Sequence, residues 1–359
     1  MKKVLVIQQK MIGDVLASTL LCEHLKIHFP EAQVHFLINE HTRAVVDGNP
    51  FIDKIVIFKN EFKKEKTQFY RFLKEIKKEQ YDVVIDVYCK LESNLISYFT
   101  KAAIKISYKK WYSKFIYSHL FTYSQNPDTK LGLAIENRLL LLSPLIPELK
   151  KPDLAPKIFL SAEEVIAAKN LLSKHQIATA KKLIMIGILG SSPIKSYPLA
   201  YLAKVIDYIT EKHEVTLLFN YIPSQKSIVL ELLKLCSTKS REAIKEGLFC
   251  PSLREFLGLL SICDAYVGNE GGATNMSKAL GIPNFSIFSP WISKKAWLTY
   301  NENPSNRAIH LSDYIEKDLN QIPKKERKKN SIELYQLLKP AYFKEELLAF
   351  LKSEVFSNQ

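Results

Sequence analysis

Two adjacent glycines, Gly271 and Gly272, separate an apolar segment from a helix-forming segment, an arrangement that can bind phosphate. The apolar residues 265–267 predict a buried strand, and residues 274–280 predict a helix. A tight turn between them leaves free backbone N–H groups at the positive end of the helix dipole. Glu270, directly before the glycines, offers an acceptor for a sugar hydroxyl. Gly-Gly pairs are also common in the turns that precede helices of α/β proteins. This turn alone therefore leaves the function open.

A carboxylate stands in a comparable position near the N-terminus. Residues 4–7 predict a buried parallel strand, and Gly13 and Asp14 precede a predicted helix at 15–29. Aspartate is a common N-cap, and a carboxylate there can also act as general base for an acceptor hydroxyl. From the spacing alone the cap is favoured. Gly13 beside it lets a substrate come close.

A third segment, residues 187–198, combines hydroxyls with a lysine after another predicted strand. Ser191 and Ser192 can donate hydrogen bonds to phosphate, and Lys195 can neutralise the charge of a departing diphosphate. A solvated loop lysine is the alternative interpretation, because most lysines are exposed.

Taken together and in this order, the three segments resemble those of glycosyltransferase family 9, the bacterial lipopolysaccharide heptosyltransferases. The strand, Ile12-Gly13-Asp14 and helix resemble the family's start. The Ser-Ser-Pro-Ile-Lys-Ser-Tyr-Pro loop resembles its Ser/Thr-rich loop. The turn at 267–283 resembles its nucleotide-sugar motif, usually Asp-x-Gly-x-x-His before a small-residue helix ending in Leu-Gly-x-Pro. The resemblance spans residues 4–283.

The resemblance implies an inverting, metal-independent glycosyltransferase that needs no cofactor. Its donor would be ADP-heptose, and its acceptor a lipopolysaccharide core or a related phosphorylated glycolipid. The implied catalytic residues are Asp14, as general base, and Lys195. The implied substrate-binding residues are Gly13, Ser191, Ser192, Glu270, Gly271, Gly272, Ala273 and Asn275.

Three positions depart from the family pattern, and one of them, Tyr197 in place of the usual tryptophan, is a mild change. Glu270 replaces aspartate and adds one methylene, which shifts its contact with the sugar. Asn275 replaces histidine, so the imidazole's charge is lost while an amide donor remains. The identity of the donor and the rate of transfer are the properties that the changes at Glu270 and Asn275 affect.

The alternation of short β-rich runs with amphipathic helices predicts α/β architecture with doubly wound parallel sheets. Strands are expected at 3–7, 33–37, 54–58, 83–86, 104–107, 183–187, 215–219, 265–267 and 284–288. Helices are expected at 42–48, 66–78, 91–100, 162–175, 199–211, 224–236 and 253–261, besides the two above. The resemblance implies GT-B, with two Rossmann-like domains facing a central cleft. We expect an acceptor domain at 1–158, a nucleotide-sugar domain at 159–330 and a helical segment at 331–359, interrupted at Pro340.

The composition is that of a folded protein, with 47% hydrophobic and 25% charged residues. No apolar run reaches the ~20 residues of a membrane span, and the N-terminal run is too short for a signal peptide. The five cysteines show no Cys-x-x-Cys spacing and predict reduced thiols in the cytoplasm.

The net charge of +14 indicates that the protein has an anionic partner. Residues 101–121, here called the basic-aromatic segment, carry five lysines among six aromatic residues and no acid. Such a surface suits an anionic membrane or a phosphorylated glycolipid, and it predicts a cytoplasmic enzyme held peripherally at the inner membrane. The alternative is that half of these aromatic residues lie in the core.

Two other functions remain open. A binding-only protein with the same fold would keep the nucleotide-sugar site without catalysis, although Asp14 and Lys195 favour an enzyme. A basic nucleic-acid-binding protein is less favoured, because the chain carries no recognisable motif of that kind. Nucleic acid is therefore not expected as a partner.

Overall fold

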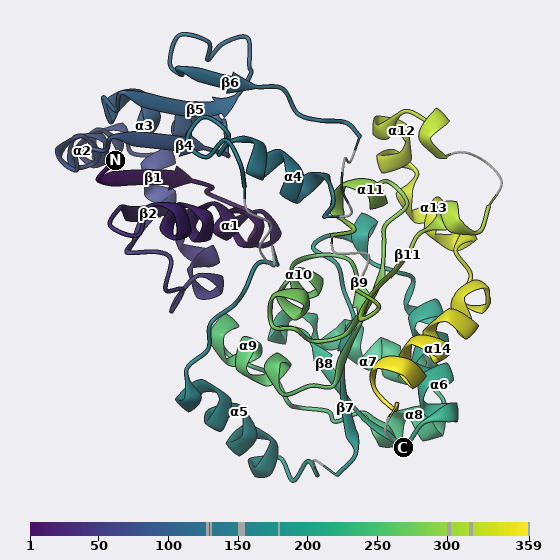
Figure 1. Ribbon diagram of the computed structural model, residues 1–359. Helices are drawn as coiled ribbons and strands as arrows, with labels where there is room; N and C mark the ends of the chain where they lie inside the picture. Colours follow the sequence, from purple (N-terminus) through teal and green to yellow (C-terminus); the bar gives the residue numbers. More distant parts are fainter. Residues whose placement is uncertain are drawn as a thin grey trace. The chain divides into compact units, whose positions relative to one another are not determined.

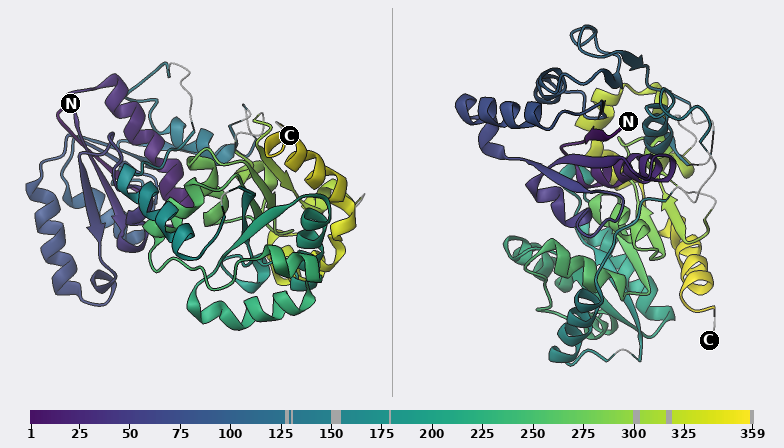
Figure 2. Two further views of the ribbon diagram at one scale, coloured as in Figure 1. Left: turned by 90° about the horizontal axis from the view of Figure 1, so that it is seen from below. Right: turned by 60° about the vertical axis from the view of Figure 1, so that its left-hand side comes forward.

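Both halves of the chain fold as α/β units with parallel sheets. The computed structural model describes residues 1–126, 129, 131–149, 155–178, 180–299, 303–315 and 319–357. The chain divides into two units, Met1–Phe159 and Leu160–Gln359. In each unit, helices cover both faces of the sheet (Figures 1 and 2).

The sheet of the first unit has the strand order β3-β2-β1-β4-β5-β6, and all neighbouring strands are parallel. Its strands are β1 (Lys3–Ile7), β2 (Gln33–Asn39), β3 (Lys54–Phe58), β4 (Val83–Asp86), β5 (Ile104–Tyr108) and β6 (His119–Phe121). The chain starts at β1 in the middle of the sheet and adds β2 and β3 on one side. It then crosses to the other side of β1, where it adds β4, β5 and β6. The winding direction therefore reverses between β1 and β4, and ligands of doubly wound sheets bind at the carboxyl ends beside such a reversal.

Helices of the first unit pack on apolar residues that alternate along the strands. They are α1 (Ile12–His28), α2 (Lys66–Lys78), α3 (Leu91–Phe99) and α4 (Leu133–Leu140), with 3-10 turns η1 (Glu40–Val45) and η2 (Asn60–Lys63). Leu5 and Ile7 of β1 share a core cluster with Leu73 of α2 and Ile96 of α3. That cluster defines the face covered by α2 and α3. Helix α1 packs on the opposite face, beside α4.

The second unit has the strand order β11-β10-β9-β7-β8, again with every neighbouring pair parallel. Its strands are β7 (Lys182–Gly187), β8 (Val215–Asn220), β9 (Ala265–Asn269), β10 (Asn284–Ile287) and β11 (Asn306–Ile309). Here the winding reverses between β7 and β9, so these two strands border the expected ligand position.

The closing helices belong to the core of the second unit. Phe343, Leu347 and Phe350 lie in the same buried cluster as Ile184 and Ile186 of β7. The helices of this unit are α5 (Ala162–Lys174), α6 (Leu199–Lys212), α7 (Lys226–Leu235), α8 (Thr238–Ala243), α9 (Leu253–Ser261), α10 (Gly272–Ala279), α11 (Lys294–Trp297), α12 (Lys324–Lys329), α13 (Ser331–Leu337) and α14 (Lys344–Glu354). Its 3-10 turns are η3 (Pro193–Lys195), η4 (Pro223–Gln225), η5 (Leu311–Asp313), η6 (Leu319–Gln321) and η7 (Pro340–Phe343).

The nine predicted strands are present, with shifts of at most two residues at their ends. The helix expected at 42–48 is instead the 3-10 turn η1, and the short strands β6 and β11 and the helices α4, α8, α11 and α12 were not predicted. As expected, Pro340 separates two helices, because it begins η7 between α13 and α14.

Candidate functional site

The three segments with predicted chemistry follow β1, β7 and β9 at the carboxyl ends of these strands. In the first unit β1 borders the reversal of winding, and in the second unit β7 and β9 are the two strands on either side of it. Both units therefore present their candidate residues at the position where doubly wound sheets bind ligands.

Asp14 lies in the first turn of α1, because this helix begins at Ile12, earlier than predicted. The N-cap position belongs to Met11, so Asp14 is not the capping residue itself. Its Oδ1 accepts a hydrogen bond from Arg138 Nη2 at 2.6 Å, and its Oδ2 is 3.4 Å from the Met11 amide nitrogen. The Asp14 side chain is 31% exposed. One carboxylate oxygen is thus held firmly, and the other makes only a long contact.

Arg138 of α4 holds the carboxylate of Asp14, a contact that the sequence did not reveal. Its side chain is 8% exposed. Its Nε donates to Ser18 Oγ at 2.9 Å, and its Nη1 donates to the Ala134 carbonyl at 2.5 Å. These bonds fix the guanidinium before any ligand arrives. Because 124 positions separate Arg138 from Asp14, no local pattern could have linked them.

The loop after β7 closes tightly into η3 and presents Ser191, Ser192 and Lys195. A Cβ atom at Gly190 would lie 2.2 Å from the Lys195 carbonyl oxygen, so only glycine permits this closure. The Gly190 amide donates to Ser196 Oγ at 3.0 Å. The hydroxyls of Ser191 and Ser192 and the ammonium of Lys195 make no hydrogen bond or ion pair within the described part of the chain. These three groups are available to a ligand.

Asn269, the last residue of β9, joins this loop to the glycine turn. Its Nδ2 donates to the carbonyls of Gly187 and Ile188 at 3.0 and 2.9 Å. Its Oδ1 accepts from the Tyr197 amide at 2.7 Å. The buried amide thereby holds the segments after β7 and β9 together, a role that the sequence did not predict.

The glycine turn opens α10 at Gly272, two residues before the predicted start. A Cβ atom added at the N-cap residue Gly271 would meet no atom within 4 Å, so there is space beside the helix end. The amides of Gly272 and Ala273 belong to the first turn, where a helix leaves its N–H groups unpaired. Asn275 donates through Nδ2 to the Gly271 carbonyl at 2.9 Å. Its side-chain donor therefore supports the turn.

Glu270 provides a buried carboxylate next to two lysines. It is 7% exposed, and its Oε2 has no hydrogen-bond partner among the described residues. Burial raises the pKa of Glu270, while the charges of Lys195 and Lys278 act in the opposite direction. Burial likewise lowers the pKa of Lys278 of α10 to about 8, against the attraction of Glu270. The structure thus brings Lys195 and Glu270 within electrostatic reach of each other.

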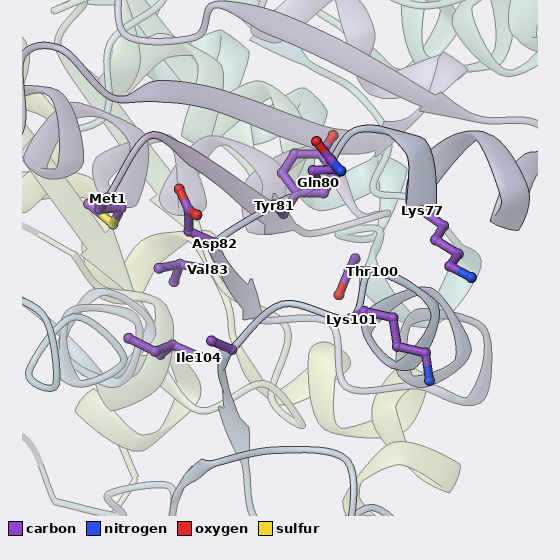
Figure 3. A pocket seen from close by; sticks show the side chains of 10 residues that line it. Met1, Lys77, Gln80, Tyr81, Asp82, Val83, Thr100, Lys101 and Ile104 are labelled. Carbon is purple, nitrogen blue, oxygen red and sulfur yellow. The ribbon is translucent and has the colours of Figure 1, made fainter.

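The predicted residues form two groups, one in each unit. Gly13 and Asp14 lie in the first unit, and Ser191, Ser192, Lys195 and residues 270–275 lie in the second. A surface pocket of about 630 Å³ in the first unit lies elsewhere (Figure 3). Val83 and Ile104, which line it, begin β4 and β5, so it is at the amino edge of the sheet, opposite to Asp14.

Among the described residues, no group of three or more His, Cys, Asp or Glu side chains is placed to hold a metal ion. Within the same residues, no helix is long and apolar enough to cross a membrane.

The fold is that of the GT-B glycosyltransferases. A solved family 9 glycosyltransferase from Veillonella parvula superposes with a TM-score of 0.71 at 18% identity, covering 93% of this chain and 97% of that one. The Escherichia coli ADP-heptose lipopolysaccharide heptosyltransferase II superposes with a TM-score of 0.68 at 16% identity, covering 94% and 99%.

The chain belongs to glycosyltransferase family 9 (heptosyltransferase), whose sequence pattern matches residues 69–325. It is therefore a glycosyltransferase. A lipopolysaccharide heptosyltransferase 1 from Campylobacter coli is 26% identical over 295 residues, which is 80% of this chain and 83% of that protein. A lipooligosaccharide heptosyltransferase 2 from Haemophilus ducreyi is 23% identical over 314 residues, covering 82% and 87%.

Proposed function

We propose that this protein transfers a heptose from ADP-heptose to a lipopolysaccharide core or a related phosphorylated glycolipid, with inversion at the anomeric carbon. The observation that carries the proposal is the group around the start of α10. There, an unpaired lysine, a buried carboxylate with a free oxygen and unpaired helix amides meet beside open space. The names of the relatives, which are heptosyltransferases, support the choice of sugar.

In the second unit, the diphosphate of the donor would bind to the amides of Gly272 and Ala273 and to the hydroxyls of Ser191 and Ser192. Lys195 would neutralise the charge that grows on the diphosphate as the bond from the anomeric carbon breaks. Glu270 would accept hydrogen bonds from hydroxyl groups of the sugar, which would satisfy its free Oε2.

In the first unit, Asp14 would take the proton from the acceptor hydroxyl as its oxygen attacks the anomeric carbon. Arg138 would keep Oδ1 in place, so that Oδ2 receives the proton. A single displacement with this base inverts the configuration, because the acceptor attacks from the side opposite to the departing diphosphate.

A donor screen tests the proposed function. The protein would be incubated with ADP-, UDP-, GDP- and CMP-linked sugars, and thermal unfolding would be followed for each. Ligand at 100 times its Kd stabilises a folded protein by about 2.7 kcal/mol, so the true donor should raise the Tm clearly. Stabilisation by ADP-heptose but not by the others, lost in Lys195→Ala, is the expected result.

Stabilisation by another nucleotide sugar alone would reject the assignment of the donor. Binding of ADP-heptose without any transfer to lipopolysaccharide core acceptors would indicate a binding protein instead of an enzyme. Strong, salt-sensitive retention of DNA or RNA, with no response to any nucleotide sugar, would favour the nucleic-acid alternative.

We also propose that the enzyme works at the inner face of the cytoplasmic membrane, held there by the basic-aromatic segment. Trp111 is 83% exposed and Phe115 is fully exposed, so neither residue is committed to the core. Lys109 and Lys114 are exposed beside them. Large aromatic side chains next to lysines bind the interface of an anionic bilayer, where a glycolipid acceptor resides.

A further inference from the structure

Trp291, in the loop after β10, is surrounded by three lysine side chains. The ammonium nitrogen of Lys195 lies 5.7 Å from the centroid of the indole ring. Those of Lys324 and Lys328, both from α12, lie at 6.0 and 5.3 Å. Cations at such distances are attracted by an aromatic face. We call these three lysines and Trp291 the lysine collar.

The collar concentrates three positive charges, and the buried Glu270 carboxylate lies within electrostatic reach of one of them, Lys195. None of its three lysines forms an ion pair with an acid among the described residues. The Nε1–H of Trp291 is buried and has no hydrogen-bond partner there either. Like charges that share one small region repel each other, and a bound polyanion removes that repulsion.

Hydrogen bonds hold the three segments that build the collar against each other. The Ile194 carbonyl, next to Lys195, accepts from Ser289 Oγ at 2.7 Å and from Ser331 Oγ at 2.8 Å. Ser289 precedes Trp291 by two positions, and Ser331 begins α13, which is separated from α12 by one residue. The two serine hydroxyls are themselves 3.0 Å apart. The convergence of the lysines thus rests on a built junction.

We propose that Lys324 and Lys328 complete the diphosphate site from the C-terminal side, with Trp291 as the floor between them and Lys195. This inference rests on the proposed function, since it takes the ligand to be a nucleoside diphosphate or its sugar. The collar selects a diphosphate over a monophosphate, because a second phosphoryl group supplies the additional negative charge that two further lysines can bind. It also holds the product as negative charge accumulates during bond cleavage.

The helix α12 offers a matched control. Lys325 and Lys329 are exposed on the same helix, and neither lies over the Trp291 ring. The double variants Lys324→Gln/Lys328→Gln and Lys325→Gln/Lys329→Gln lose equal charge from the same segment. Calorimetric titration with ADP and with AMP would compare them with the wild-type protein at low and moderate salt.

For Lys324→Gln/Lys328→Gln, the Kd for ADP should rise about tenfold or more, since each charge-assisted contact contributes appreciably. The Kd for AMP should change much less, and the salt dependence of ADP binding should weaken. The control pair should bind ADP like the wild type. Equal losses in both pairs, or no loss in either, would overturn the collar.

Tryptophan fluorescence gives a second readout. Trp291→Phe keeps an aromatic floor but removes the fluorophore, so the fluorescence change on ADP binding should disappear while calorimetry still detects binding. A change that persists would place the diphosphate away from Trp291. If Lys195→Ala loses ADP while the Lys324/Lys328 variant retains it, only the collar fails. A wild-type protein that binds no nucleotide at all would reject the proposed function as well.

Discussion

At Asp14, the bond from Arg138 leaves only one carboxylate oxygen free, and in the proposed mechanism this oxygen takes the proton. Oδ1 is occupied at 2.6 Å, whereas Oδ2 has only a long contact to the Met11 amide. Asp14→Asn keeps the shape of the side chain and a hydrogen-bonding oxygen for Arg138. We expect this variant to fold and to bind the donor normally, with turnover reduced about a hundredfold or more. Near-normal turnover in a transferase assay would leave Asp14 with a structural role only.

Arg138 provides a separate prediction, because its effect should pass through Asp14. Arg138→Met removes the charged partner and should lower kcat by about tenfold or more with little change in the donor Kd. Arg138→Lys keeps the charge but loses the fork geometry of the guanidinium. Its kcat should therefore lie between that of the wild type and that of Arg138→Met. Ser18→Ala removes a bond to the guanidinium while leaving Asp14 paired. Donor binding that falls in parallel with kcat in Arg138→Met would indicate general misfolding and contradict the positioning role.

In the second unit, the titration of Lys278 should make donor binding depend on pH. The pKa of Lys278 is lowered to about 8, so its positive charge is present at pH 7 and largely lost at pH 9. Affinity for the nucleotide sugar should therefore fall across this window. Lys278→Gln should bind more weakly at pH 7 and show a flatter profile, as measured by calorimetry at pH 7, 8 and 9. A profile that keeps its full slope in Lys278→Gln would assign the titration to another group.

At the scale of residues, the sequence could predict features that depend on neighbouring residues, but not contacts between residues far apart in the chain. The adjacent residues Gly271 and Gly272 are a local signal, and they predict open space beside the start of a helix. The structure has such space, because a Cβ atom at Gly271 would meet no atom within 4 Å. The partnership of Asp14 with Arg138 depends on how α1 and α4 pack, and no local pattern records it. Asn275 was expected to offer a donor to the ligand, and its position also lets the side-chain amide donate to the Gly271 carbonyl, a contact that the sequence did not predict.

At the scale of elements, the strands were predictable because parallel strands buried on both faces are continuous apolar runs. β1 and β4 match their predicted ranges for this reason, with every residue from Val4 to Ile7 buried. β6, with three residues and only partial burial, is too short to give such a signal. The segment 42–48 was expected to be helical, but only the 3-10 turn η1 forms there, and the chain turns through Gly48 with φ of 78°.

A buried carboxylate connects the elements around the basic-aromatic segment. Asp86 ends β4, is fully buried, and accepts from Tyr117 Oη at 2.5 Å and from the Cys89 amide at 2.9 Å. Tyr117 also contacts Asn94 Oδ1 of α3 at 2.8 Å. These bonds fasten the basic-aromatic segment to β4 and α3.

The pKa of Asp86 gives this junction a testable pH dependence. Burial raises this pKa from 3.8 to about 6, against the hydrogen bonds from Tyr117 and Cys89. The native state therefore holds a proton that the unfolded state has lost, and this contribution to stability disappears as the pH rises from about 4 to about 6. The difference in unfolding free energy between Asp86→Asn and wild type should shift in favour of the variant across this window.

Urea unfolding at pH 4, 5, 6 and 7 measures this difference, and the other carboxylates cancel because both proteins carry them. Tyr117→Phe is a second variant, which should lower the stability where Asp86→Asn is expected to raise it relative to wild type. It removes a donor from a buried carboxylate and should destabilise the protein by about 1–3 kcal/mol. A constant difference between Asp86→Asn and wild type at all four pH values would show that Asp86 does not titrate in this range.

At the scale of the whole molecule, each half carries its own reversal of winding, and each holds part of the proposed site. The first unit holds the carboxylate of Asp14, and the second holds Lys195, Glu270 and the amides that begin α10. The two-part pattern was visible in the sequence because the alternation of strands and helices starts again after the proline-rich residues 144–156, of which 150–154 lie outside the described residues. The membership of α14 in the second core was not visible, because Leu347 and Phe350 gain their meaning only from their contact with β7 and its neighbours.

The net charge of +14 leads to the last prediction, which concerns the membrane. Each lysine near an anionic surface contributes about 1 kcal/mol, and the exposed rings of Trp111 and Phe115 add apolar contact. Replacing Lys109, Lys110 and Lys114 by Gln should therefore reduce sedimentation with vesicles that contain anionic lipid, and impair transfer to a lipid-borne acceptor. Nucleotide-sugar binding should be unchanged.

A matched control removes the same charge elsewhere in the first unit. Lys59, Lys64 and Lys66 are exposed around η2 and the start of α2, and none of them forms an ion pair among the described residues. If net charge alone governs attachment, this triple variant will detach as readily as the first, and the basic-aromatic segment loses its special role. If the segment is the docking surface, the control will sediment like the wild type, and Trp111→Ala/Phe115→Ala will weaken the binding that persists at high salt, because apolar burial is not screened by ions.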